Sequence, residues 1–62
     1  MELSPKDCLK KAILDTQEKV RDYESHAKNI DDQEISSCFK KFAEEEGHQA
    51  VKLQELLDKC DN

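Results

Sequence analysis

The apolar residues of this chain recur at helical spacing in two stretches, and only a few residues separate the two stretches. Steps of three and four residues place side chains on one face of an α-helix, so each stretch predicts an amphipathic helix. A connection this short turns the second helix back beside the first. The sequence therefore predicts an all-α fold, an antiparallel helical hairpin. The positions concerned are Leu9, Ala12, Ile13, Thr16, Val20, Tyr23, Ala27 and Ile30 in the first stretch and Ile35, Phe39, Phe42, Leu53, Leu56, Leu57 and Cys60 in the second.

Signals for a helix start precede both stretches: Ser4, Pro5 and Asp7 for the first, and Ile30, Asp31, Glu34 and Ile35 for the second. In each, a capping residue stands three positions before an acidic residue, as in a capping box. Proline suits the first helical position, and the two isoleucines can pack across the second cap. We therefore expect one domain over residues 1–62, with helices over about 5–29 and 32–60.

Length and composition indicate that the chain needs a neighbour. A domain of 62 residues, with 35% hydrophobic and 40% charged residues, can bury only a marginal core by itself. Leu14 and Val51 fall outside the two apolar stripes, and Ala43 and Ala50 widen the second one. More apolar surface is present than one hairpin can cover. We therefore expect self-association, most simply as a homodimer that forms a four-helix bundle.

The net charge of −5 disfavours nucleic acids and anionic membrane surfaces as partners, because both are negatively charged. No apolar run reaches the length of a membrane span, and the first residues lack the apolar segment of a secretory signal. We therefore expect a cytoplasmic protein without a membrane partner, although a protein partner is possible.

The cysteine pattern matches neither a disulfide framework nor a zinc site. Cys8, Cys38 and Cys60 are odd in number and far apart in the sequence. We expect reduced, partly buried thiols.

The segment from Phe42 to Ala50 is the only candidate for chemistry. Glu45 and His48 stand one helical turn apart, and a carboxylate with an imidazole suits iron, manganese or zinc. However, the centre of the apolar stripe lies nearer to Glu46 and Gln49, and a neutral amide is a weak metal ligand. We therefore expect no cofactor, with iron as the alternative.

The first helix offers no carboxylate opposite this segment. In the hairpin, positions whose numbers sum to about 62 should face each other, which places Thr16 and Gln17 near Glu46. We expect Glu46 to bond one of these or to pair with a lysine. Asp15 points away from the stripe, and Glu24 lies on its flank about two turns away. Asp15 or Glu24 could therefore serve as a ligand only in an assembly of several chains.

The second stretch resembles a known family. The segment Ile35–Leu57, with Phe39, Ala43, three consecutive glutamates, His48 and Ala50, resembles the second helix of a rubrerythrin-like or ferritin-like half-bundle, and Tyr23 and Ala27 are similar to residues of its first helix. The resemblance implies that two hairpins form a four-helix bundle in which carboxylates and Glu-x-x-His motifs hold two irons.

This chain departs from the family pattern at two of three positions. Glu46 matches the ligand glutamate, whereas Gln49 occupies the histidine place and Thr16 or Ile13 stands where a glutamate is expected. A shift of one residue would instead align Glu45 and His48, with Asp15 from the first helix. Gly47 could permit such a rotation through a helix bulge, or it could admit another helix.

Three functional hypotheses follow. The first, which we favour, is a non-enzymatic hairpin protein that self-associates into a ferritin-like bundle. The second is an iron-binding or ferroxidase-type assembly that uses Glu45, Glu46 and His48 from several chains. The third is a regulatory hairpin that docks on a signalling protein, because the segment 53–58 is similar to the signature of short sporulation phosphatases.

Overall fold

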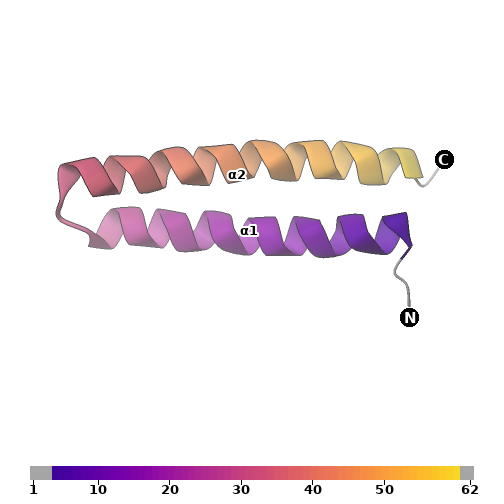
Figure 1. The fold of residues 1–62 in the computed structure, drawn as a ribbon, viewed down its shortest axis with the longest axis horizontal. Coiled ribbons are helices and arrows are strands. Elements are labelled where there is room, and N and C mark those ends of the chain that lie inside the picture. The colour runs from indigo at the N-terminus through magenta and orange to yellow at the C-terminus, as the bar shows by residue number, and fades with distance from the viewer. Residues whose placement is uncertain (1–3, 61–62) are drawn as a thin grey trace.

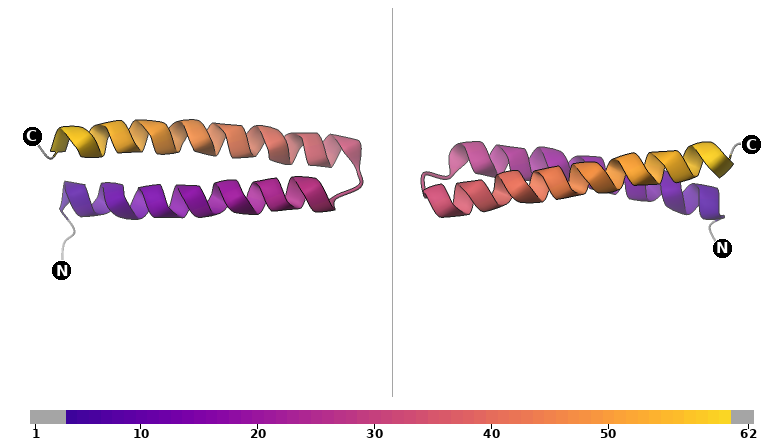
Figure 2. Two further views of the ribbon diagram at one scale, coloured as in Figure 1. Left: turned by 180° about the vertical axis from the view of Figure 1, so that it is seen from behind. Right: turned by 90° about the horizontal axis from the view of Figure 1, so that it is seen from above.

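A computed structural model describes residues 4–60, which form two helices, α1 (Pro5–Asn29) and α2 (Gln33–Cys60). The helices run antiparallel, with both ends of the chain at the same end of the molecule (Figure 1). Figure 2 shows them side by side over their whole length and crossing at a shallow angle. The predicted all-α hairpin is confirmed. Neither helix is both long enough and apolar enough to span a bilayer.

The start of α1 forms as the sequence predicts. The Asp7 amide donates to Ser4 Oγ at 3.1 Å, and the Ser4 hydroxyl donates to the Asp7 carboxylate at 3.0 Å. The first of these bonds satisfies one of the amides that a helix start leaves without a partner within the helix. At the other end, Ile30 is extended and donates its amide to the His26 carbonyl at 3.1 Å. Residues 30–32 then complete the connection to α2 without a glycine.

The cap of α2 lies one residue later than the sequence predicts. Asp32, and not Asp31, accepts from the Ile35 amide at 3.0 Å, and its carbonyl accepts from the Ser36 amide at 2.9 Å. Glu34 is then one position too early to complete a capping box. The later start is compatible with a contact between the helices, because the Ser36 hydroxyl donates to the Ala27 carbonyl at 2.7 Å. That carbonyl belongs to the last turn of α1 and would otherwise lack a partner.

The cap can be tested by comparing the two aspartates. Asp32→Ala should lower the free energy of unfolding by about 1 kcal/mol, because it removes the acceptor of the Ile35 amide. Asp31→Ala, which removes no such acceptor, should change it by less than about 0.5 kcal/mol. Urea unfolding followed by circular dichroism at one protein concentration measures both. Equal losses would mean that the two residues share the cap.

The two helices meet along a seam whose residues are spaced alternately three and four apart. Such spacing keeps one narrow line of side chains facing a neighbouring helix. Every seam residue is buried or half-buried. The seam consists of Leu9, Ile13, Thr16, Val20, Tyr23, Ala27 and Ile30 of α1 and Ser36, Phe39, Ala43, Glu46, Ala50, Leu53 and Leu57 of α2.

On α2 the seam is rotated relative to the predicted stripe. Ile35, Phe42, Leu56 and Cys60 were expected to face α1, but all four are exposed. Their places in the seam are taken by smaller or polar residues, among them Ala43. One hairpin therefore covers only part of the predicted stripe, because apolar residues cover a wider arc of α2 than one neighbouring helix can bury.

The resulting core is thin. Ile13, Ala27 and Ala43 are the buried hydrophobic residues, and Thr16 is buried with its hydroxyl donating to the Ala12 carbonyl at 2.7 Å. None of the described side chains is less than 2% exposed. One hairpin therefore excludes water from very little apolar surface.

Candidate functional site

The structure separates the residues of the predicted metal site. Glu45 and His48 are exposed, whereas Glu46 is half-buried in the seam. Gln49 is also exposed, so it does not face α1 within one hairpin. It lies seven residues from both Phe42 and Leu56 and shares their rotation away from the seam.

Glu46 does not form the bonds expected of it. The Thr16 hydroxyl is directed to its own helix, at the Ala12 carbonyl. Within residues 4–60, no hydrogen bond or ion pair engages the Glu46 carboxylate. A half-buried carboxylate without a partner in the seam is unfavourable unless water or another chain supplies one.

The candidate ligands of α1 are engaged or distant. Asp15 pairs with Lys11 at 2.8 Å on an exposed face. This hydrogen bond and the negative charge of Asp15 raise the pKa of the Lys11 ammonium. Glu24 lines a separate hollow with Lys40 and Glu44. In the described part of the chain, no three His, Cys, Asp or Glu side chains gather where they could hold a metal ion. A metal site would therefore need ligands from several chains.

This arrangement predicts that the protein retains no iron. After incubation with ferrous iron under anaerobic conditions and desalting, elemental analysis should give a value equal to that of a buffer blank. The matched control is Glu46→Ala, which should behave identically. Iron that is retained by the natural chain and lost in Glu46→Ala would instead support the second hypothesis.

α2 runs through Gly47 as an unbroken α-helix, so the suggested bulge is absent there. Nothing lies within 4 Å of the position that a Cβ atom would occupy. Gly47→Ala should therefore raise the free energy of unfolding by about 1 kcal/mol, the difference in helix propensity between the two residues. Thermal unfolding measures this gain. A loss of stability would mean that another helix approaches Gly47 closely.

All three cysteines are free and exposed, which corrects the expectation of partly buried thiols. Cys8 and Cys38 lie outside the seam, and Cys60 lies in the last turn of α2. The segment 53–58 also has a structural role, because Leu53 and Leu57 belong to the seam and Asp58 accepts from the Gln54 amide at 3.0 Å.

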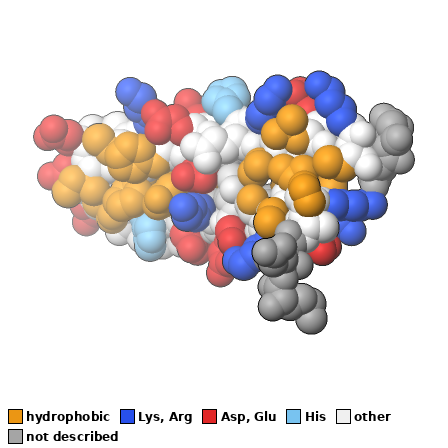
Figure 3. Space-filling view, turned by 45° about the vertical axis from the view of Figure 1, so that its right-hand side comes forward, with side chains coloured by type: hydrophobic (Ala, Val, Ile, Leu, Met, Phe, Trp, Pro, Cys, Tyr) orange, Lys and Arg blue, Asp and Glu red, His pale blue; other side chains and the backbone are white. Residues whose placement is uncertain are grey.

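The most distinctive feature of the surface is an apolar face with two patches. Ile35, Phe42, Gln49 and Leu56 follow each other at intervals of seven residues and form one line along α2. Three of the four are large and apolar, with exposed fractions of 47%, 43% and 37%. In Figure 3, apolar side chains gather near each end of the molecule, and a polar band separates the two groups.

The loop-end patch is aromatic. It consists of Tyr23, His26, Ile35, Phe39 and Phe42. Phe39 has ring-centroid distances of 5.7 Å to Tyr23, 5.1 Å to His26 and 6.1 Å to Phe42, and Tyr23 lies 6.0 Å from Phe42. These separations are typical of favourable aromatic pairs. The rings hold one another in place while Phe42 remains exposed.

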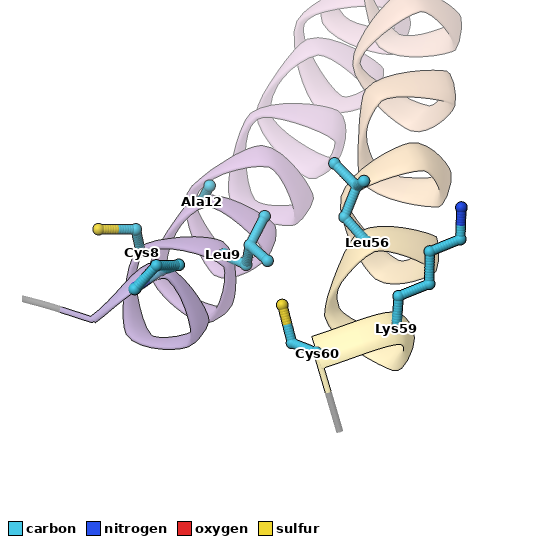
Figure 4. A pocket seen from close by; sticks show the side chains of 7 residues that line it. Cys8, Leu9, Ala12, Leu56, Lys59 and Cys60 are labelled. Atoms are coloured by element: carbon cyan, nitrogen blue, oxygen red, sulfur yellow. The ribbon is translucent and has the colours of Figure 1, made fainter. Parts of the chain in front are cut away.

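The open-end patch surrounds a hollow of about 610 Å³ between the two helices. Figure 4 shows Leu9 and Leu56 reaching toward each other across it, with the Cys60 thiol between the helices and the Cys8 thiol directed away from α2. The patch consists of Pro5, Cys8, Leu9, Ala12, Leu56 and Cys60. An apolar hollow of this kind can receive a side chain from a partner.

The opposite face carries a smaller apolar surface. Leu14 and Val51 are 66% and 60% exposed there. A hollow of about 270 Å³ is lined by Lys10, Ile13, Leu14, Gln54 and Leu57, and the hollow beside Val20 is bordered by Glu24, Lys40 and Glu44. Both are smaller than the hollow of about 610 Å³ at the open end. The apolar face is therefore the better candidate for an interface.

The protein is therefore an antiparallel two-helix hairpin with two apolar patches on one broad side. Comparisons with protein-family models, with curated proteins and with solved structures found no match.

Proposed function

We propose that this chain is a non-enzymatic bundle-forming protein, in which the apolar face of one hairpin packs against that of a second copy. The product would be a four-helix bundle of the ferritin-like type that the sequence resembles. The observation that carries the proposal is the exposure of Ile35, Phe42 and Leu56 on one side of a hairpin whose own core is thin. Such side chains each gain roughly 1.5–3 kcal/mol when they are fully buried.

The size of the face suits a stable dimer. The hairpin measures 45 × 23 Å across its broad side, an outline of about 1,000 Å², which is of the same order as the roughly 800 Å² that each partner buries in a standard interface. An interface of this kind would also complete the core, because a four-helix bundle buries side chains between two layers of helices.

The charge distribution also supports a second copy as the partner. The chain carries a net charge of −5, which would oppose association if the acidic residues lay within the interface. The polar band at the middle of the face contains Glu46 and Lys19, and Lys59 lines the hollow at the open end. Most of the excess negative charge therefore lies outside the proposed contact.

Coupled folding and association gives a direct test. The midpoint of thermal unfolding should rise as the protein concentration is raised from micromolar to millimolar, because mass action favours the associated native state. Circular dichroism at several concentrations measures this. A midpoint independent of concentration, with a monomeric mass, would contradict the proposal.

A further inference from the structure

The register of the two helices makes Lys19 of α1 and Glu46 of α2 neighbouring positions in the polar band of the apolar face. His26 of α1 contacts Phe39 of α2, and Lys19 and Glu46 occupy the equivalent positions seven residues further from the loop. Lys19 is exposed and Glu46 is half-buried. The band therefore places a positive group on α1 beside a negative group on α2, at the middle of the face.

The pair is incomplete within one hairpin. In the described part of the chain, neither an ion pair nor a hydrogen bond engages Glu46. Covering the apolar face would remove the remaining water from its carboxylate, which is costly unless a cation approaches it. A partner surface must therefore bring positive charge to the position of Glu46.

Two copies of the hairpin can pack face to face about a two-fold axis in two ways. The axis runs either parallel to the helices or perpendicular to them, within the plane of the interface. With the loops at the same end, each α1 covers the partner's α2. With the loops at opposite ends, α1 covers the partner's α1 and α2 covers the partner's α2. Both arrangements place apolar patches on apolar patches. With the loops at the same end each patch meets its own copy, whereas with the loops at opposite ends the loop-end patch meets the partner's open-end patch. The order of charges in the polar band also differs.

The order of charges around the centre differs between the two arrangements. With loops at the same end, the four groups alternate as Lys19, Glu46, the second Lys19 and the second Glu46. With loops at opposite ends, the two Glu46 carboxylates are neighbours, and so are the two Lys19 ammonium groups. Like charges in contact within a desolvated interface are unfavourable, whereas alternating charges attract.

We infer that two copies of this chain pair with their loops at the same end, each α1 against the partner's α2, and that Lys19 and Glu46 of both copies form a ring of alternating charge. The inference rests on the proposed self-association. It adds the orientation of the two copies and gives Glu46 a partner.

The orientation can be measured with a spin label in the loop. Asp31→Cys supplies the site in a chain whose three natural cysteines are replaced by serine, and Asp32 keeps its capping role. Helices pack about 8–10 Å apart, so two loops at the same end lie close together. Pulsed electron–electron double resonance should therefore report roughly 15–30 Å between the two labels. Loops at opposite ends would instead give a distance near the 45 Å length of the hairpin. A dimer with that long distance overturns this inference alone, whereas a monomeric chain also overturns the proposed function.

Exchange of the two charges tests the ring. Lys19→Glu and Glu46→Lys should each weaken dimerisation by roughly tenfold, because each leaves four like charges together. The double exchange should restore the natural dissociation constant to within about threefold, since alternation returns. Circular dichroism before the measurement verifies that each variant is helical. A double variant as weak as the single ones would overturn the ring.

Discussion

Phe42→Glu should convert the proposed dimer to a helical monomer. Phe42 is 43% exposed and stands in the loop-end patch against Tyr23, so a dimer would bury it at the centre of an aromatic cluster. A carboxylate there would be desolvated without a partner. Loss of such an anchor costs at least about 3 kcal/mol, so the dissociation constant should rise by roughly 100-fold or more.

Val51→Glu is the matched control for Phe42→Glu. Val51 is also apolar and is more exposed, at 60%, but it belongs to the opposite face. Its replacement should leave the dissociation constant unchanged within about threefold, as for surface substitutions in general. Isothermal dilution calorimetry measures both variants. If Val51→Glu dissociates the dimer and Phe42→Glu does not, the interface lies on the opposite face, which contains Val51.

Ile13→Ala should remove most of the stability of the hairpin. Ile13 is 8% exposed and is the largest of the three buried hydrophobic residues, so its truncation removes the most apolar contact from the seam. Such truncations cost about 2–5 kcal/mol. A chain of 62 residues has a total stability of only roughly 3–9 kcal/mol. Urea unfolding should therefore show a midpoint that is sharply lowered.

Leu14→Ala provides the comparison at the next position. Leu14 is 66% exposed, so its truncation should cost less than about 0.5 kcal/mol, although it removes the same carbon atoms as Ile13→Ala. The contrast depends only on which face of α1 each residue occupies. Equal losses of unfolding free energy for the two variants would show that Ile13 is not buried between the helices as described.

The helices and their pairing were predictable because the signals for them are local. Ser4 and Pro5 fix the start of α1, and the short connection leaves α2 no direction other than back along α1. Spacing of three and four residues then selects helices over strands. These features act within a few residues, so they can be interpreted without knowledge of any distant contact.

The cap and the orientation of α2 were less accessible from sequence. Asp31 and Asp32 are chemically equivalent caps, and the structure uses Asp32, with Ser36 reaching the Ala27 carbonyl. The apolar arc of α2 combines residues that face α1 with residues that α1 leaves exposed. The centre of that arc therefore points between α1 and the exposed apolar face, which is why Phe42 and Gln49 were placed near the centre of the predicted stripe.

The candidate metal residues illustrate the difference between spacing and direction. Glu45 and His48 have the spacing of a ligand pair, yet both are exposed on α2. Successive residues of an α-helix point about 100° apart, so Glu45 and His48 point to solvent while Glu46 lies in the seam. Spacing can be taken from the sequence, but the direction of each side chain depends on which face the neighbouring helices cover.

Sedimentation equilibrium of the natural chain tests the central claim, that the exposed face of the hairpin binds a second copy. The proposed dimer should have a mass of twice 7.2 kDa at micromolar concentrations and should dissociate reversibly on dilution. A mass of 7.2 kDa that persists up to millimolar concentration would contradict it, because the apolar face would then remain exposed to water in the native protein.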